Sequence, residues 1–121
     1  MSFILVPKNG ADVQVNGWNW RPTLLLISRA GLVSDEEYER MGANGCGGMV
    51  DAAKALRIAE IIQAQVDKMK TGARMRADFT VTRLTQPVDL RSDPNELYSA
   101  SYDWLCRFRD FCRTSGGFEV V

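Results

Sequence analysis

The sequence predicts an α+β domain dominated by helices, with three or four helices packed on a small, mostly antiparallel sheet. Two observations lead to this fold class: apolar residues recur at spacings of three and four in several stretches, and short segments of alternating polarity lie near both ends. The 121 residues contain no internal repeat and no long linker, so one globular domain over 1–121 is expected. An all-α bundle with extended termini is the alternative, and it follows if residues 73–82 are helical.

The first residues predict a β-hairpin. Residues 3–6 form a short apolar run that ends at Pro7, and the Lys-Asn-Gly that follows is typical of a turn. Val13 and Val15 alternate with polar residues, which indicates a second strand over 13–15.

A turn into the first helix is expected around the two tryptophans. Asn19 or Arg21 is the predicted N-cap, and Pro22 is predicted close to the first helical position, where a missing N–H costs nothing. The helix then covers residues 23–30, and Gly31 ends it in the left-handed conformation that glycine adopts easily.

Ser34 and Glu37 have the spacing of a capping box, which predicts a short second helix that ends at Gly42. A third and longest helix is expected from Val50 or Asp51 to Lys70. Its apolar positions step by four and three; they are Ala55, Ala59, Ile62, Val66 and Met69.

Residues 75–82 alternate between apolar and polar side chains, so a half-buried strand is expected there. The last helix is predicted to begin at Asp93, with Pro94 in its first turn, and to end at Gly116 and Gly117. A final strand follows over 118–121. The predicted sheet therefore uses residues 3–6, 13–15, 77–81 and 118–121, and the predicted core comprises Phe3, Leu5, Leu25, Leu26, Ile58, Ile62, Val66, Phe79, Trp104, Leu105, Phe108 and Phe111.

The composition makes several classes of chemistry improbable. The chain has no histidine, which removes the commonest general base and most catalytic zinc sites. Three cysteines without C-x-x-C spacing predict neither a disulfide framework nor a metal site. No cofactor motif is found, and we expect no metal, no cofactor and no catalytic residue. With no signal-peptide pattern and no apolar run long enough to span a bilayer, a cytoplasmic protein is expected.

By this elimination, the leading hypothesis is a non-catalytic protein that binds another protein, of the bacterial or phage immunity, antitoxin, anti-defence or adaptor type. Tryptophan and arginine are enriched in interface hot spots. The candidate contacts are therefore Trp18, Trp20, Arg21, Arg74, Arg76 and Arg83. We expect one tryptophan of the pair to be packed and the other to be partly exposed. Alanine at Trp20 or Arg76 should then weaken the partner without unfolding the domain.

Two other hypotheses stay open. The glycine-rich loop 44–51 precedes a predicted helix, so its glycines Gly45, Gly47 and Gly48 are candidates for binding a nucleotide or another anion. Against this, no Lys-Ser/Thr completes a phosphate loop, and Asp51 would repel an anion. A basic strip over residues 68–91 is the candidate for weak nucleic-acid binding. Equal numbers of basic and acidic residues, 15 each, make this improbable. Self-association is compatible with all three hypotheses.

Overall fold

The computed structural model describes residues 2–43, 47–82 and 99–121 and shows a small α+β domain, as predicted. In these residues, four helices accompany two antiparallel sheets, whose strand orders are β2-β1-β7-β3 (sheet A) and β5-β4-β6 (sheet B). The elements are β1 (Ser2–Pro7), β2 (Val13–Asn16), α1 (Gly17–Arg29), α2 (Asp35–Gly42), β3 (Gly48–Asp51), α3 (Ala52–Val66), β4 (Arg74–Arg76), β5 (Val81–Thr82), β6 (Ser99–Ser101), α5 (Tyr102–Thr114) and β7 (Gly117–Val120). The all-α alternative is therefore wrong.

Sheet A contains the predicted hairpin and the predicted C-terminal strand, but its fourth strand was not expected. β3 pairs with β7, with Val50 opposite Phe118, and takes the place predicted for residues 77–81. Gly48 begins β3, and its position has no room for a side chain, because a Cβ there would overlap Cγ of Met41. A four-residue strand that starts with glycine is too short to produce a clear alternation in the sequence.

Helix α1 begins six residues earlier than predicted. Its N-cap is Asn16, whose side chain accepts a hydrogen bond from the N–H of Asn19 at 2.9 Å, and Pro22 lies inside the helix. Because α1 includes Trp20, its buried side is set by the spacing of Trp20, Leu24 and Ile27. Leu25, which we predicted to be in the core, is only partly buried.

The capping box of α2 is confirmed. Ser34 Oγ accepts from the N–H of Glu37 at 3.1 Å, and Glu37 Oε1 accepts from the N–H of Ser34 at 3.0 Å. Glu37 also forms an ion pair with Lys54 at 3.2 Å, which joins α2 to α3. Helix α3 begins after its own cap, Asp51, and ends at Val66, four residues short of the predicted Lys70.

The predicted single strand over residues 75–82 is wrong, because the chain turns back on itself there. β4 and β5 are the two arms of an antiparallel hairpin, with Met75 opposite Val81. Asp78 Oδ1 accepts from both the N–H and the hydroxyl of Thr80, at 3.0 and 2.6 Å, and Phe79 has a φ of 70°. An aspartate that bonds the backbone two residues onward favours a turn over a continuous strand.

The last helix, α5, starts at Tyr102 and is capped by Ser101, which accepts from the N–H of Trp104 at 3.1 Å. The start predicted at Asp93 is wrong for α5, because β6 precedes it; the cap residues 93–96 lie outside the described part of the chain. The predicted stop is confirmed by Gly116 and Gly117, both with positive φ.

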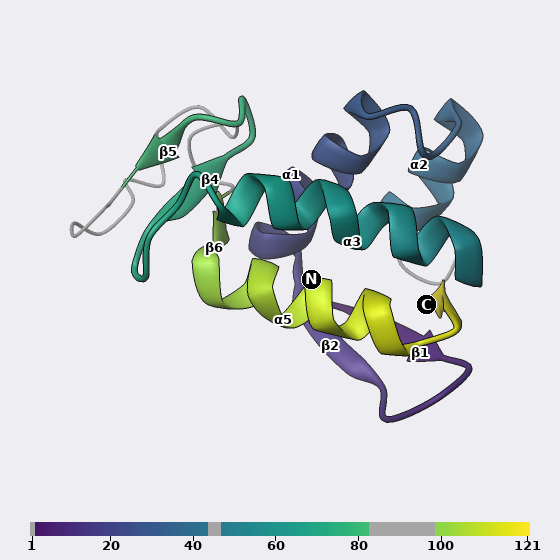
Figure 1. Cartoon of the computed structure of the whole chain (residues 1–121). Helices are drawn as coiled ribbons and strands as arrows, with labels where there is room; N and C mark the ends of the chain where they lie inside the picture. The colour runs from purple at the N-terminus through teal and green to yellow at the C-terminus, as the bar shows by residue number, and fades with distance from the viewer. Residues whose placement is uncertain (1, 44–46, 83–98) are drawn as a thin grey trace.

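Figure 1 shows α3 and α5 side by side, and these helices form the main helical contact. Between them and sheet A lies an aromatic cluster. Phe108 is fully buried, with its ring stacked on Trp104 at 5.3 Å and edge-on to Trp20 at 5.7 Å and Phe118 at 6.1 Å. The predicted core is thus largely confirmed, with Trp20, Leu24, Ile27, Met41 and Met75 as major additions.

Candidate functional site

Sheet A has one covered face and one open face. Residues that point toward the helices, such as Phe3, Leu5 and Val120, are at most 3% exposed. On the opposite face, four large apolar side chains are exposed: Ile4 (40%), Val6 (37%), Met49 (62%) and Val121 (38%). With Glu119, these four residues define what we call the open sheet face. No helix within the described ranges covers it.

Strand register makes the open sheet face continuous. Val6, Glu119 and Met49 lie opposite one another across β1, β7 and β3. Ile4 and Val121 exchange two backbone hydrogen bonds of 2.9 Å. They are therefore directly opposite one another on β1 and the end of the chain, next to the Val6–Glu119 pair. Side chains directly opposite one another in an antiparallel sheet have Cβ atoms about 5 Å apart. The aliphatic residues therefore form one patch, with a single carboxylate in it.

The carboxylate of Glu119 on β7 lies near Gly47, the residue before β3. A Cβ at Gly47 would lie 3.4 Å from Glu119 Oε1. An anion at Gly47 would meet this negative charge at close range. In addition, Gly48 is part of the β3–β7 ladder, and Asp51 caps α3 with its own carboxylate. These contacts make Gly47 and Gly48 unfavourable for an anion, and the anion-binding hypothesis stays a prediction; Gly45 lies outside the described residues.

The two tryptophans lie on α1 and point in different directions, because residues two apart on an α-helix are separated by about 200° around its axis. Trp20 is 1% exposed, and its indole N–H donates to the carbonyl of Met41 at 2.8 Å. Trp20 is therefore a core residue, and its prediction as a partner contact is wrong. Trp18 is 42% exposed, so the expectation of one packed and one partly exposed tryptophan is confirmed.

Arg21 lines a cavity of about 440 Å³ between α1 and α2, on the helix side of sheet A. Its apolar lining includes Phe3, Trp20 and Leu24, whereas Arg21, Tyr38 and Glu39 supply polar groups. This volume is within the usual range for small organic ligands. The cavity and the open sheet face lie on opposite sides of sheet A, since Phe3 belongs to the covered face.

Arg74 and Arg76 both lie on β4, on the same side of the strand, whereas Arg83 is outside the described residues.

The sequence did not identify the open sheet face. Its only signal was that Ile4 and Val6 occupy the positions of the first strand that alternate with Phe3 and Leu5. A run of four apolar residues has no visible alternation, so the open side of the strand could not be distinguished from the covered one.

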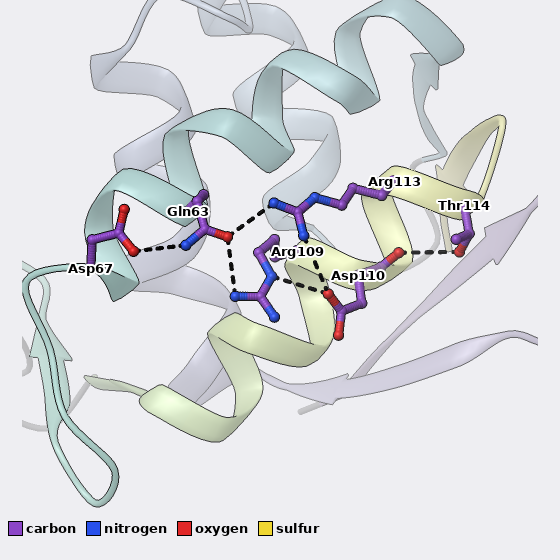
Figure 2. Close-up of polar contacts among 6 residues, drawn as sticks. All are labelled: Gln63, Asp67, Arg109, Asp110, Arg113 and Thr114. Carbon is purple, nitrogen blue, oxygen red and sulfur yellow. Dashed lines mark hydrogen bonds and ion pairs between the residues drawn. The ribbon is translucent and has the colours of Figure 1, made fainter.

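A polar network ties the outer sides of α3 and α5 together (Figure 2). Gln63 Oε1 accepts from Arg109 at 3.2 Å and from Arg113 at 2.9 Å, and Gln63 Nε2 donates to Asp67 at 2.8 Å. Asp110 accepts from Nε of Arg109 at 3.0 Å. The polar and charged groups of this network bond to one another. Their structural role is to link α3 to α5.

Reactive groups are scarce in the part of the chain that the structure describes. No cluster of three or more acidic or thiol side chains lies there with the spacing of a metal site. Burial raises the pKa of the Cys112 thiol far above its usual range, so this cysteine is not a nucleophile.

None of the described helices is long and apolar enough to cross a membrane. Comparison of the chain with protein-family models, curated proteins and solved structures found no match.

Proposed function

We propose that this protein is a non-catalytic binding domain and that it binds another protein through the open sheet face. One observation carries the proposal. Of the seven large apolar side chains that are exposed in the described residues, four lie together on this face. The other three, Trp18, Leu56 and Val81, belong to three different elements.

The open sheet face differs from an ordinary solvated sheet surface. An antiparallel sheet with one covered face usually presents polar residues on the other. In this chain Ile4 and Val6 follow Ser2 at the outward positions of β1, and Met49 on β3 is the most exposed of the large apolar side chains in the described residues. Covering such a patch is favourable by about 25 cal/mol for each Å² of apolar surface removed from water. A contiguous apolar patch of this kind is typical of an interaction site.

Glu119 favours a partner of different sequence over a second copy of the chain. If two copies packed face to face, both Glu119 carboxylates would be buried in the same apolar layer, which is unfavourable without a cation. A partner with aliphatic side chains around one lysine or arginine would bury the patch and pair with Glu119. The proposed occupant is therefore a protein surface that is apolar with one central basic group.

The proposal extends to the class of protein: we propose a cytoplasmic protein of the immunity, antitoxin, anti-defence or adaptor type. Cys106 and Cys112 are free thiols, as is usual in a reducing compartment. The lack of reactive clusters in the described residues supports a protein that acts by binding.

The experiment is affinity capture from the lysate of the source organism with three matched baits. They are the unchanged protein, Met49→Lys on the open sheet face, and Leu56→Lys on α3, which is 52% exposed and serves as the control. Thermal melts first establish that all three are folded. The proposal requires a stoichiometric partner that is captured by the unchanged and Leu56→Lys proteins and lost with Met49→Lys. A partner that all three baits retain, or an unchanged protein that sediments as a dimer which Met49→Lys dissociates, would contradict it.

A second pair of baits tests the role of the charge. Glu119→Lys should abolish capture, because it places a cation opposite the partner's basic group. Glu119→Gln keeps the shape of the side chain and should weaken capture by less. If both variants capture the partner as the unchanged protein does, the central basic group of the partner is disproved.

A further inference from the structure

Two helices line the cavity between α1 and α2, and each contributes residues from one of its sides. On α1 the lining residues have the spacing of a single helix side; they are Gly17, Trp20, Arg21 and Leu24. On α2 they are Tyr38, Glu39 and Gly42, which also share one side. The cavity of about 440 Å³ is thus a space between two facing helix surfaces.

The inner end of the cavity is closed by apolar side chains. Phe3, Trp20 and Leu24 are at most 3% exposed, and the indole N–H of Trp20 is already bonded to the carbonyl of Met41. The accessible wall therefore comes from the partly buried ring of Tyr38 and from the exposed residues of both helices. A molecule in the cavity would lie with its apolar part on this ring.

Gly42 keeps part of the space open. It is the last residue of α2, and its φ lies outside the left-handed region. A Cβ there would lie 3.6 Å from Cδ2 of Leu24, which is an ordinary contact distance. Alanine is favoured over glycine in a helix, so neither the backbone nor this contact requires a glycine. The side chain that is missing at this position would point toward a residue that lines the cavity.

The two walls of the cavity carry opposite charges. Gly17 is the first residue of α1, and the start of a helix carries a partial positive charge; Arg21 follows one turn later. Gly42 is the last residue of α2, where the partial charge is negative, and Glu39 precedes it by about one turn. No ion pair in the described residues joins Arg21 to Glu39.

We infer that this cavity binds a free α-amino acid with an apolar side chain. Its carboxylate would lie at the start of α1 beside Arg21, its ammonium group at the end of α2 beside Glu39, and its side chain on Tyr38. A guanidinium has five N–H donors, so Arg21 can bind a carboxylate in addition to other contacts.

The opposite charges of the walls select the zwitterion. A ligand with only a negative charge would be repelled by Glu39, and one with only a positive charge by Arg21. The inference is independent of the open sheet face, because the cavity lies on the other side of sheet A.

The experiment is a titration followed at the backbone N–H signals of Gly17, Gly42 and Ala43, all of which line the cavity. The probes are L-leucine and L-phenylalanine, each with two analogues of single charge: isopentylamine and isocaproate for leucine, phenethylamine and hydrocinnamate for phenylalanine. We expect at least one amino acid to move the three signals to saturation. Its analogues should bind about tenfold more weakly, because each lacks one charge-assisted contact. The signal of Gly72, which lies in the turn before β4, should stay in place.

Charge variants assign the two ends of the ligand. Glu39→Gln should weaken binding of the amino acid about tenfold and should not weaken binding of the acid analogue. Arg21→Gln should weaken binding of the amino acid in the same way and should not weaken binding of the amine analogue. Glu36→Gln removes an exposed carboxylate of α2 outside the lining and serves as the control, with unchanged binding expected.

A filled cavity provides the last test. Gly42→Val places a side chain toward Leu24 and should abolish binding while the protein stays folded. Three results would overturn the inference: no movement of the cavity signals with either amino acid, equal affinity for an amino acid and both of its analogues, or unchanged binding by a folded Gly42→Val protein. If Gly42→Val does not fold, the comparison of each amino acid with its analogues on the unchanged protein still decides.

Discussion

The indole N–H of Trp104 on α5 donates a hydrogen bond of 2.9 Å to the hydroxyl of Thr23 on α1, and both residues are buried. The same hydroxyl donates to the carbonyl of Asn19 at 2.8 Å, so its donor and one acceptor position are used. The Asn19 side chain in turn accepts from the N–H of Ser101 at 3.0 Å. Helix α1 is thereby joined to the start of α5 by side-chain bonds in the interior.

Thr23→Val should destabilise the domain, because valine has the shape of threonine but no hydroxyl. The Trp104 N–H would stay buried without an acceptor, which costs about 1–3 kcal/mol. Urea unfolding of the variant measures this loss. Thr23→Ser keeps the hydroxyl and is the control; it should lose much less stability from the polar contact. In Trp104→Phe the donor is already gone, so adding Thr23→Val there should cost clearly less than in the unchanged protein.

The two tryptophans of α1 should respond in opposite ways to truncation. Trp20→Ala removes a buried ring and its bond to Met41, and we expect a loss of about 3–5 kcal/mol. Trp18→Ala removes a half-exposed ring and should leave the unfolding midpoint within a few degrees of its value. Thermal melts followed by circular dichroism compare the two variants. A stable Trp20→Ala protein would restore Trp20 as a possible surface contact.

Gly48→Ala tests the close contact between β3 and α2. The added methyl would lie 2.3 Å from Cγ of Met41, so α2 or β3 has to move. Overpacking of this kind typically costs about 1–3 kcal/mol. Denaturant unfolding of Gly48→Ala, with and without Met41→Ala, checks the cause: the glycine substitution should cost less once the methionine has been shortened. Equal costs in both backgrounds would show that the strain comes from the backbone.

Stability should depend on pH through Glu37. The backbone hydrogen bond from Ser34 and the Lys54 ammonium hold the pKa of this carboxyl below its usual 4.5. A carboxyl with a lowered pKa in the folded state stabilises the fold above its unfolded pKa, and loses that effect as the pH falls through its folded pKa. Glu37 is partly exposed, so the ion pair contributes about 0.5 kcal/mol at most.

Glu37→Gln therefore has a specific signature in melts recorded at several pH values. It should lower the melting temperature slightly at pH 7, and the difference from the unchanged protein should shrink toward zero below pH 4.5. A difference that is the same at all pH values would assign the effect to the shape of the capping box and not to its charge.

The fold class, both ends of sheet A and the capping box were predictable because their signals are local. Ser34 and Glu37 lie three residues apart, and Gly116 and Gly117 come just after Ser115, the C-cap of the helix that they end. The start of α1 was missed because Pro22 is a strong signal for a first turn, whereas the actual cap, Asn16, competes with an equally plausible Asn19. The hairpin of sheet B was missed because a side-chain turn at Asp78 does not interrupt the alternation of polarity.

The candidate sites depend on tertiary structure, and the sequence predicted them only in part. It identified Arg74 and Arg76 by residue type, but the bonds from Arg74 to Ser99 are a property of the packed sheet. It identified Trp20 for its residue type, and burial contradicted that prediction. The position of the open sheet face depends on which side of β1 the helices cover. Those helices come from distant parts of the chain, so the sequence of β1 does not reveal which side stays open.

The position of β7 between β1 and β3 has a consequence for the order of folding. β1 is formed by residues 2–7 and β7 by residues 117–120, and among the described residues β7 alone bridges β1 and β3. During synthesis, sheet A can therefore be completed only after β7 has been made, even if the β1–β2 hairpin has already formed. Long-range strand pairing of this kind is slow and leaves strand edges exposed in the meantime. Until then, the nascent chain presents apolar strands to chaperones and to its neighbours.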